Sequence, residues 1–114
     1  MIKKLEGLLA NAGMDTEVSG NTVFAYKDGT TLVASYREMS HDFTAIAVEA
    51  SVDEVKAAIE GCRLWKTGRY SAGRILYSKY EDLGLQLASR LHVCNHDHSL
   101  GEIRREVMSW LNPQ

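Results

Sequence analysis

The residues with the clearest chemical potential lie near the end of the chain, in the run His92-Val93-Cys94-Asn95-His96-Asp97-His98. Imidazole and thiolate are good ligands for zinc or copper, so His92, Cys94, His96 and His98 are weak candidates for a metal site. Alternate residues of an extended strand lie in a row roughly 6.5–7 Å apart, and such a row rarely closes around one ion. We therefore favour a polar loop before a final helix, in which Asp97 stabilises the helix N-terminus. No physiological metal site is predicted.

Other signals for catalysis are weak. A nucleophilic Cys94 would need a base held by a third group and an oxyanion hole, and a short His/Cys run does not predict either. The chain contains no phosphate-binding glycine motif and no His-Glu-x-x-His motif. The acidic pairs 53–54 and 81–82 fall at a predicted helix start and a predicted turn, where acids cap and solvate. We therefore expect no enzymatic activity and no cofactor.

A basic and aromatic cluster in the middle of the chain supplies the candidate partner-binding residues Arg63, Trp65, Lys66, Arg69 and Tyr70. Tryptophan, tyrosine and arginine dominate the hot spots of protein interfaces. In the alternative interpretation, the two aromatic residues anchor a loop on the core and the basic residues are solvated. Stacking of nucleic-acid bases is a third reading. A net charge of −2 lacks the basic excess of a nucleic-acid binder, so no nucleic-acid partner is predicted.

The first half of the chain predicts a helix, three strands and a second helix. An apolar stripe at helical spacing indicates a helix over residues 2–12. Strands over 22–27 and 30–37 flank Asp28-Gly29, a strong signal for a tight hairpin. A third strand over 43–50 is apolar on both faces, so it should be central or covered. Ser51 and Glu54 have the spacing of a capping box, which begins a helix over 52–61.

The second half predicts strands over 74–80 and 83–93, joined by a turn, and a capped helix over 99–111. The order is therefore α-β-β-β-α-β-β-α. Five antiparallel strands would form one sheet with helices packed on its apolar face, which defines an α+β fold. With 114 residues, the whole of 1–114 is expected to form a single domain.

The composition of the chain indicates where in the cell the protein is expected. Apolar residues make up 45% and charged residues 25%, as in an ordinary globular domain. No apolar run reaches the length of about 18 residues that a membrane span requires, and the first residues do not resemble a signal peptide. Two cysteines, Cys62 and Cys94, are too few for a disulfide framework. We expect both to be reduced thiols of a cytoplasmic protein without membrane partners.

The element order resembles the type III secretion chaperone-like fold, and within it the YbjN family of bacterial proteins. The resemblance rests on the aliphatic middle helix, Trp65 just after it, Tyr70 shortly beyond, a hairpin and the capped final helix. Such families carry asparagines around the tryptophan, whereas this chain has Cys62, Arg63 and Lys66 there. The resemblance implies a non-enzymatic, often dimeric module that binds an extended segment of another protein. It also implies a candidate dimer surface at Val55, Ala58, Ile59 and Cys62.

Three functions follow as hypotheses. The first is a chaperone-like or regulatory protein-binding module that forms a homodimer. The second is an immunity-type or inhibitor protein that blocks one specific enzyme. The third is a small metal-binding protein that uses the segment from His92 to His98.

Overall fold

The computed structural model describes residues 2–37, 42–93, 101–102, 104–105 and 108–109. Its elements are α1 (Ile2–Asn11), β1 (Asp15–Ser19), β2 (Thr22–Lys27), β3 (Thr30–Arg37), β4 (Asp42–Val48), α2 (Val52–Glu60), α3 (Arg63–Lys66), α4 (Ala72–Lys79) and β5 (Leu87–Val93).

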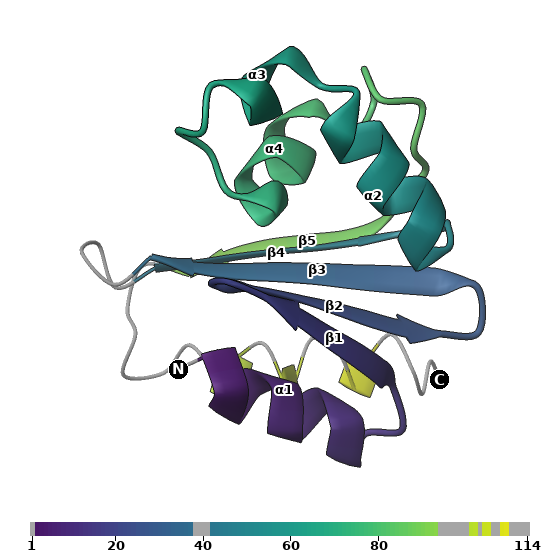
Figure 1. The fold of residues 1–114 in the computed structure, drawn as a ribbon. Coiled ribbons are helices and arrows are strands. Elements are labelled where there is room, and N and C mark those ends of the chain that lie inside the picture. The colour runs from purple at the N-terminus through teal and green to yellow at the C-terminus, as the bar shows by residue number, and fades with distance from the viewer. Residues whose placement is uncertain (1, 38–41, 94–100, 103, 106–107, 110–114) are drawn as a thin grey trace.

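The strands form one antiparallel sheet in the order β1-β2-β3-β4-β5, so β1 and β5 are its two edges (Figure 1). The hairpin between β2 and β3 turns at Asp28 and Gly29, whose φ angles of 52° and 83° fit the predicted tight turn. Gly20 and Asn21 form a second two-residue loop between β1 and β2. The chain returns to the sheet through β5, after the three helices α2, α3 and α4.

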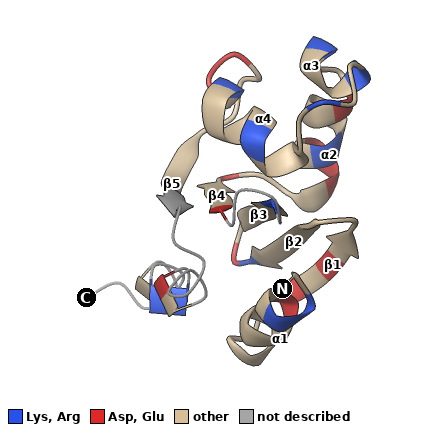
Figure 2. Cartoon of the chain, turned by 90° about the vertical axis from the view of Figure 1, so that its left-hand side faces the viewer, with Lys and Arg blue, Asp and Glu red and all other residues tan. Residues whose placement is uncertain are grey.

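Helices cover both faces of the sheet. The helix α1 lies on one face, and α2, α3 and α4 form a layer on the other (Figures 1 and 2). Every residue of β4 is buried, which confirms the prediction that this strand is covered. Only one covered face was predicted, and this expectation was wrong because β2, β3 and β4 carry apolar side chains on both sides.

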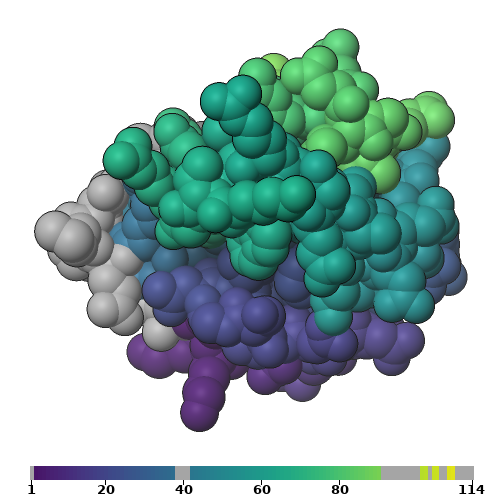
Figure 3. All heavy atoms as spheres, turned by 45° about the horizontal axis from the view of Figure 1, so that its top comes forward, coloured from purple at the N-terminus to yellow at the C-terminus, as the bar shows by residue number. Residues whose placement is uncertain are grey.

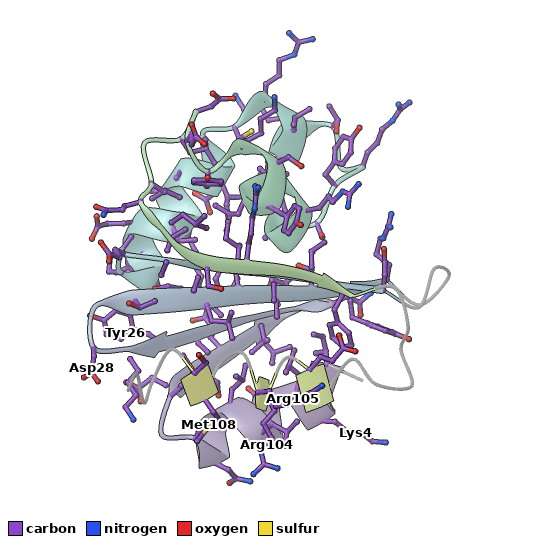
Figure 4. All side chains as sticks on the ribbon, turned by 180° about the vertical axis from the view of Figure 1, so that it is seen from behind. Lys4, Tyr26, Asp28, Arg104, Arg105 and Met108 are labelled. Atoms are coloured by element: carbon purple, nitrogen blue, oxygen red, sulfur yellow. The ribbon has the colours of Figure 1, made fainter. Side chains whose placement is uncertain are left out.

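The core below the sheet contains Leu5 and Leu9 of α1, packed with Val23, Leu32 and Phe43 of the strands. The described part of the predicted final helix lies on this side too. Residues 101–102, 104–105 and 108–109 are helical, within the predicted range. Arg104, Arg105 and Met108 lie on the same side of the sheet as Lys4 of α1 (Figure 4).

The core above the sheet joins α2 and α4 to the strands through Val55, Ile59 and Leu76. The capping box of α2 is present as predicted, because Ser51 Oγ accepts from the Glu54 amide and the Glu54 carboxylate accepts from the Ser51 amide. Thr31 Oγ1 donates a buried hydrogen bond of 2.6 Å to the Ala50 carbonyl, which ties β3 to the segment before α2.

The first turn of α4 approaches the sheet very closely. Ser71 Oγ accepts from the Arg74 amide, and the Gly73 amide donates to Ser35 Oγ of β3 at 2.9 Å. Ser35 Oγ is also 2.7 Å from Thr22 Oγ1 in the neighbouring strand. A buried polar group costs stability unless it is paired, so these contacts fix where α4 rests on the sheet.

The predicted α+β class and five-stranded antiparallel sheet are confirmed. However, one segment predicted as a strand of the sheet is a helix, and one strand of the sheet was not predicted. Residues 74–80 were predicted as a strand and form most of helix α4. The reason is the Ser71 cap, followed by buried Ala72, Ile75 and Leu76 at helical spacing. The fifth strand is instead β1, which was not predicted. The predicted strand over 83–93 begins at Leu87, because residues 80–84 form a turn and residues 85–86 are irregular.

Candidate functional site

The edge strand β1 is exposed along most of its length, and Asp15, Glu17, Val18 and Ser19 are all exposed. Ser19 and Thr22 flank a two-residue loop, so they form a hydrogen-bonded pair, as do Glu17 and Phe24. The amide and carbonyl groups of Thr16 and Val18 therefore point outward. Among the described residues, no strand pairs with this outer edge.

A groove of about 210 Å³ runs beside β1 on the upper face of the sheet. It forms because α4 packs on β3 and β4 and α2 reaches β2, so this helical layer stops short of the edge strand. The teal residues of α2 and α3 stand above the purple-to-blue residues of β1 and β2 (Figure 3). The groove is lined by Glu17, Ser19, Thr22, Phe24, Lys56, Ile59, Glu60, Trp65 and Ala72.

A lysine crosses this groove from the helical layer to the edge strand. Lys56 Nζ forms an ion pair with the Glu17 carboxylate and lies 5.4 Å from the centroid of the Phe24 ring. The side chains of Lys56 and Glu17 are 36% and 53% exposed, so solvent screens the pair and it contributes little stability. The ion pair instead fixes a position, because it holds the Lys56 ammonium group between the Phe24 ring and the Glu17 carboxylate inside the groove.

Trp65 enters the groove from the short helix α3 and keeps 41% of its surface exposed. The helix α3 follows Cys62, whose extended backbone turns the chain after α2. Thr67 Oγ1 then donates to the Leu64 carbonyl at 2.8 Å, and Gly68 turns the chain away with a φ of 69°. An exposed tryptophan is the kind of side chain that anchors protein interfaces.

The other predicted partner-binding residues do not line the groove. Arg63, Lys66, Arg69 and Tyr70 are exposed on α3 and the loop after it. Tyr70 is 43% exposed, a fraction close to the 41% of Trp65. The structure therefore brings Trp65 alone of the five predicted residues into the groove.

Of the four residues of the predicted dimer surface, two lie in the core and two are partly accessible. Val55 and Ile59 are buried in the upper core of the same chain, with exposures of 0% and 2%. Ala58 and Cys62 are half-buried and retain accessible area. Cys62 is a free thiol. Because α2 faces the sheet with its apolar stripe, only its outer side is accessible to a second copy.

The His/Cys segment is described only in part. His92 belongs to β5 and is in register with Thr44 of β4. Cys94, His96 and His98 lie outside the described residues. Within the described ranges, no three side chains of histidine, cysteine, aspartate or glutamate come together as a metal site. Likewise, no helix in the described part of the chain is long and apolar enough to cross a membrane.

Two other hollows are larger than the groove. One of about 360 Å³ lies between α1 and the helical residues Arg104 and Met108. The other, of about 430 Å³, lies at the end of the sheet near Asp28 and Leu87. The first is lined in part by a helix of which only residues 101–102, 104–105 and 108–109 are described, and the lining of the second includes no aromatic side chain. Neither adjoins the open edge of β1, so the groove is the better candidate site.

At the opposite edge of the sheet, α4 meets β5 through a cation and two aromatic rings. The Arg90 guanidinium lies 5.3 Å from the Tyr77 ring centroid and 5.8 Å from that of Tyr80. The hydrogen bond from Tyr80 Oη to the Glu81 carboxylate raises the pKa of the Tyr80 phenol. These contacts join the end of α4 to β5.

Most groove residues were missing from the sequence prediction because β1 was missing from it. Glu17 and Ser19 become neighbours of α2 only once β1 pairs with β2. The pair Gly20-Asn21 carried the missed signal, since such dipeptides between two runs of strand-forming residues are typical of hairpins.

Comparison with known proteins adds no assignment. No family model matches the chain. No curated protein matches it. No solved structure matches it.

Proposed function

We propose that this chain is a non-enzymatic, chaperone-like protein-binding module of the cytoplasm that captures an extended segment of a partner protein along β1. The observation that carries the proposal is the open edge of β1 beside a groove that holds an exposed tryptophan. Addition of a strand to an exposed edge is a recurrent mode of peptide recognition, in which main-chain hydrogen bonds give affinity and pockets give specificity.

The outward groups of Thr16 and Val18 offer two amide donors and two carbonyl acceptors to an added strand. The strand β1 is short, with five residues, and carries two carboxylates at Asp15 and Glu17. Short, charged edges resist uncontrolled pairing between sheets. A captured segment would thus need side chains that match these charges, which supports a specific partner over general aggregation.

The edge suits a foreign strand better than a second copy of β1. A second copy that paired antiparallel over the whole strand would place the two Glu17 side chains opposite each other, since Thr16 would then face Val18. Like charges directly opposite on neighbouring strands are destabilising. A homodimer, which the resemblance to the YbjN family implies, would therefore use another surface, such as the outer side of α2 with Ala58 and Cys62.

Peptide display on the folded protein tests the proposal. Random twelve-residue peptides would be selected on the wild type and then measured against Val18→Pro, which removes the outward amide without breaking a bond to β2. The control is Val18→Thr, which keeps that amide. Enriched peptides should bind the wild type and the threonine variant and lose binding to the proline variant. Equal binding to all three, or no enrichment, would overturn the proposal.

Two further measurements separate the remaining hypotheses. Light scattering should give a mass twice the 12.7 kDa of the chain, and a monomer at working concentration would overturn the homodimer. A natural partner that is a single enzyme, inhibited on binding, would select the inhibitor hypothesis instead of a chaperone-like role.

A further inference from the structure

The groove contains two combinations of an aromatic ring and a carboxylate. The first is Phe24 with Glu17, and it holds the ammonium group of Lys56. The second is Trp65 with Glu60, which line the same groove from α3 and from the end of α2. Among the described residues, no cation lies on the Trp65 ring and Glu60 forms no ion pair. The groove thus contains a second aromatic ring and a second carboxylate beside the pair that holds Lys56.

The position of Glu60 is not explained by the stability of its helix. Glu60 is the last residue of α2, and α2 has no basic residue in its last turn. A negative charge at a helix C-terminus is unfavourable because the helix dipole places partial negative charge there. Lys56, one turn earlier on the same helix, is paired with Glu17. A carboxylate at this position would be stabilised if a cation from a bound partner paired with it.

We propose that the Trp65–Glu60 combination binds an arginine or lysine side chain of the captured strand. The inference rests on the proposed function. Side chains of an added strand alternate between faces, and those on the side of Glu17 and Ser19 point toward the groove. Arg63 and Lys66 of α3 do not line the groove, so they do not occupy this position. Guanidinium groups stack on indole rings and pair with carboxylates, which makes arginine the better match.

The test uses the peptides that display enriches on the wild-type protein. We expect a basic residue at one fixed position of the enriched peptides. Replacement of that residue by glutamine should weaken binding about two- to fivefold, as should Glu60→Gln or Trp65→Leu in the protein. Asp53→Asn, which removes an exposed carboxylate from the same helix outside the groove, should leave binding unchanged.

Charge reversal provides the sharper readout. Selection on Glu60→Lys should replace the basic residue by an acidic one at the same position. If enriched peptides bind through the edge, as Val18→Pro shows, but carry no fixed basic residue or ignore Glu60→Lys, this inference fails and the proposed function stands. If no peptide depends on Val18, both fail.

Discussion

Replacement of Gly73 by alanine should destabilise the domain, because this residue is where α4 touches the sheet. A Cβ atom at position 73 would lie 2.6 Å from Ser35 Oγ, 2.9 Å from Ser35 Cβ and 3.1 Å from Thr44 Oγ1. The first two separations are too short for non-bonded contact. The helix would have to move away from β3, and the hydrogen bond from the Gly73 amide to Ser35 Oγ would lengthen from 2.9 Å.

The magnitude follows from three opposing terms. Overpacking of a core costs about 1–3 kcal/mol. Loss of a buried hydrogen bond costs about 1 kcal/mol more. Alanine gains about 1 kcal/mol over glycine inside a helix. The net loss in the free energy of unfolding should therefore be about 1–3 kcal/mol, a measurable part of the roughly 5–15 kcal/mol of a typical domain.

Urea unfolding followed by circular dichroism measures this difference. The chain offers a matched control in Gly7, a glycine inside α1 where an added Cβ meets nothing within 4 Å. Gly7→Ala should raise the free energy of unfolding by about 0.4–1 kcal/mol. If Gly73→Ala were as stable as the wild type or more stable, α4 would not rest on Ser35 and Thr44, and the position of Ala72 in the lining of the groove would be wrong.

Three further predictions concern other contacts. Thr31→Val should cost about 1–3 kcal/mol in urea unfolding, because it leaves the buried Ala50 carbonyl without its donor; an unchanged midpoint would contradict that bond. The Tyr80 phenol should titrate above its ordinary pKa in an NMR titration of its ring, and Glu81→Ala should lower that pKa. Because the folded-state pKa is raised, the associated stability is present at neutral pH and is lost as pH rises through that pKa; a Tyr80 pKa unmoved by Glu81→Ala would refute this. Glu60→Gln should stabilise α2 by about 0.3–1 kcal/mol in urea unfolding, because it removes a negative charge from the helix C-terminus, and a loss of stability would show that Glu60 has a structural partner.

Sequence patterns predicted correctly those elements whose conformation is decided by residues close together in the chain. The Asp28-Gly29 turn and the capping box of Ser51 and Glu54 both formed as expected. Each depends on residues adjacent in the chain, since backbone conformation and cap chemistry are decided within one turn. The apolar run of β4 was equally informative, because only a strand covered on both faces needs it.

The helix α4 was missed because its composition favours a strand while its spacing favours a helix. Ile75, Tyr77 and Tyr80 are typical strand residues. Ala72, Ile75 and Leu76 are buried at helical spacing, and Ser71 caps the first turn. When composition and spacing disagree, tertiary contacts decide between helix and strand. Here the deciding contact joins Gly73 and Ser35, which are 38 residues apart in the chain. Sequence alone does not reveal a contact over that separation.

The strand β1 was missed for the opposite reason. An edge strand whose side chains are exposed to solvent has few apolar residues, so it lacks the alternating pattern by which strands are predicted. The segment Asp15-Thr-Glu-Val-Ser19 has one aliphatic residue. The groove depends on this strand and on the ion pair between Lys56 and Glu17, which are 39 residues apart. Trp65 was predicted as a recognition residue from its type and neighbours, but its groove could be found only after β1 was in place.

Amide hydrogen exchange at Thr16 and Val18 tests the role of β1 most directly. In the free protein both amides should exchange rapidly, while that of Glu17, bonded to β2, should be protected. Addition of a peptide enriched by display should slow exchange at Thr16 and Val18 at least tenfold, because the added strand takes up their hydrogen bonds. Protection of both amides in the free protein, or unchanged exchange with peptide bound, would show that the edge of β1 is not the binding site.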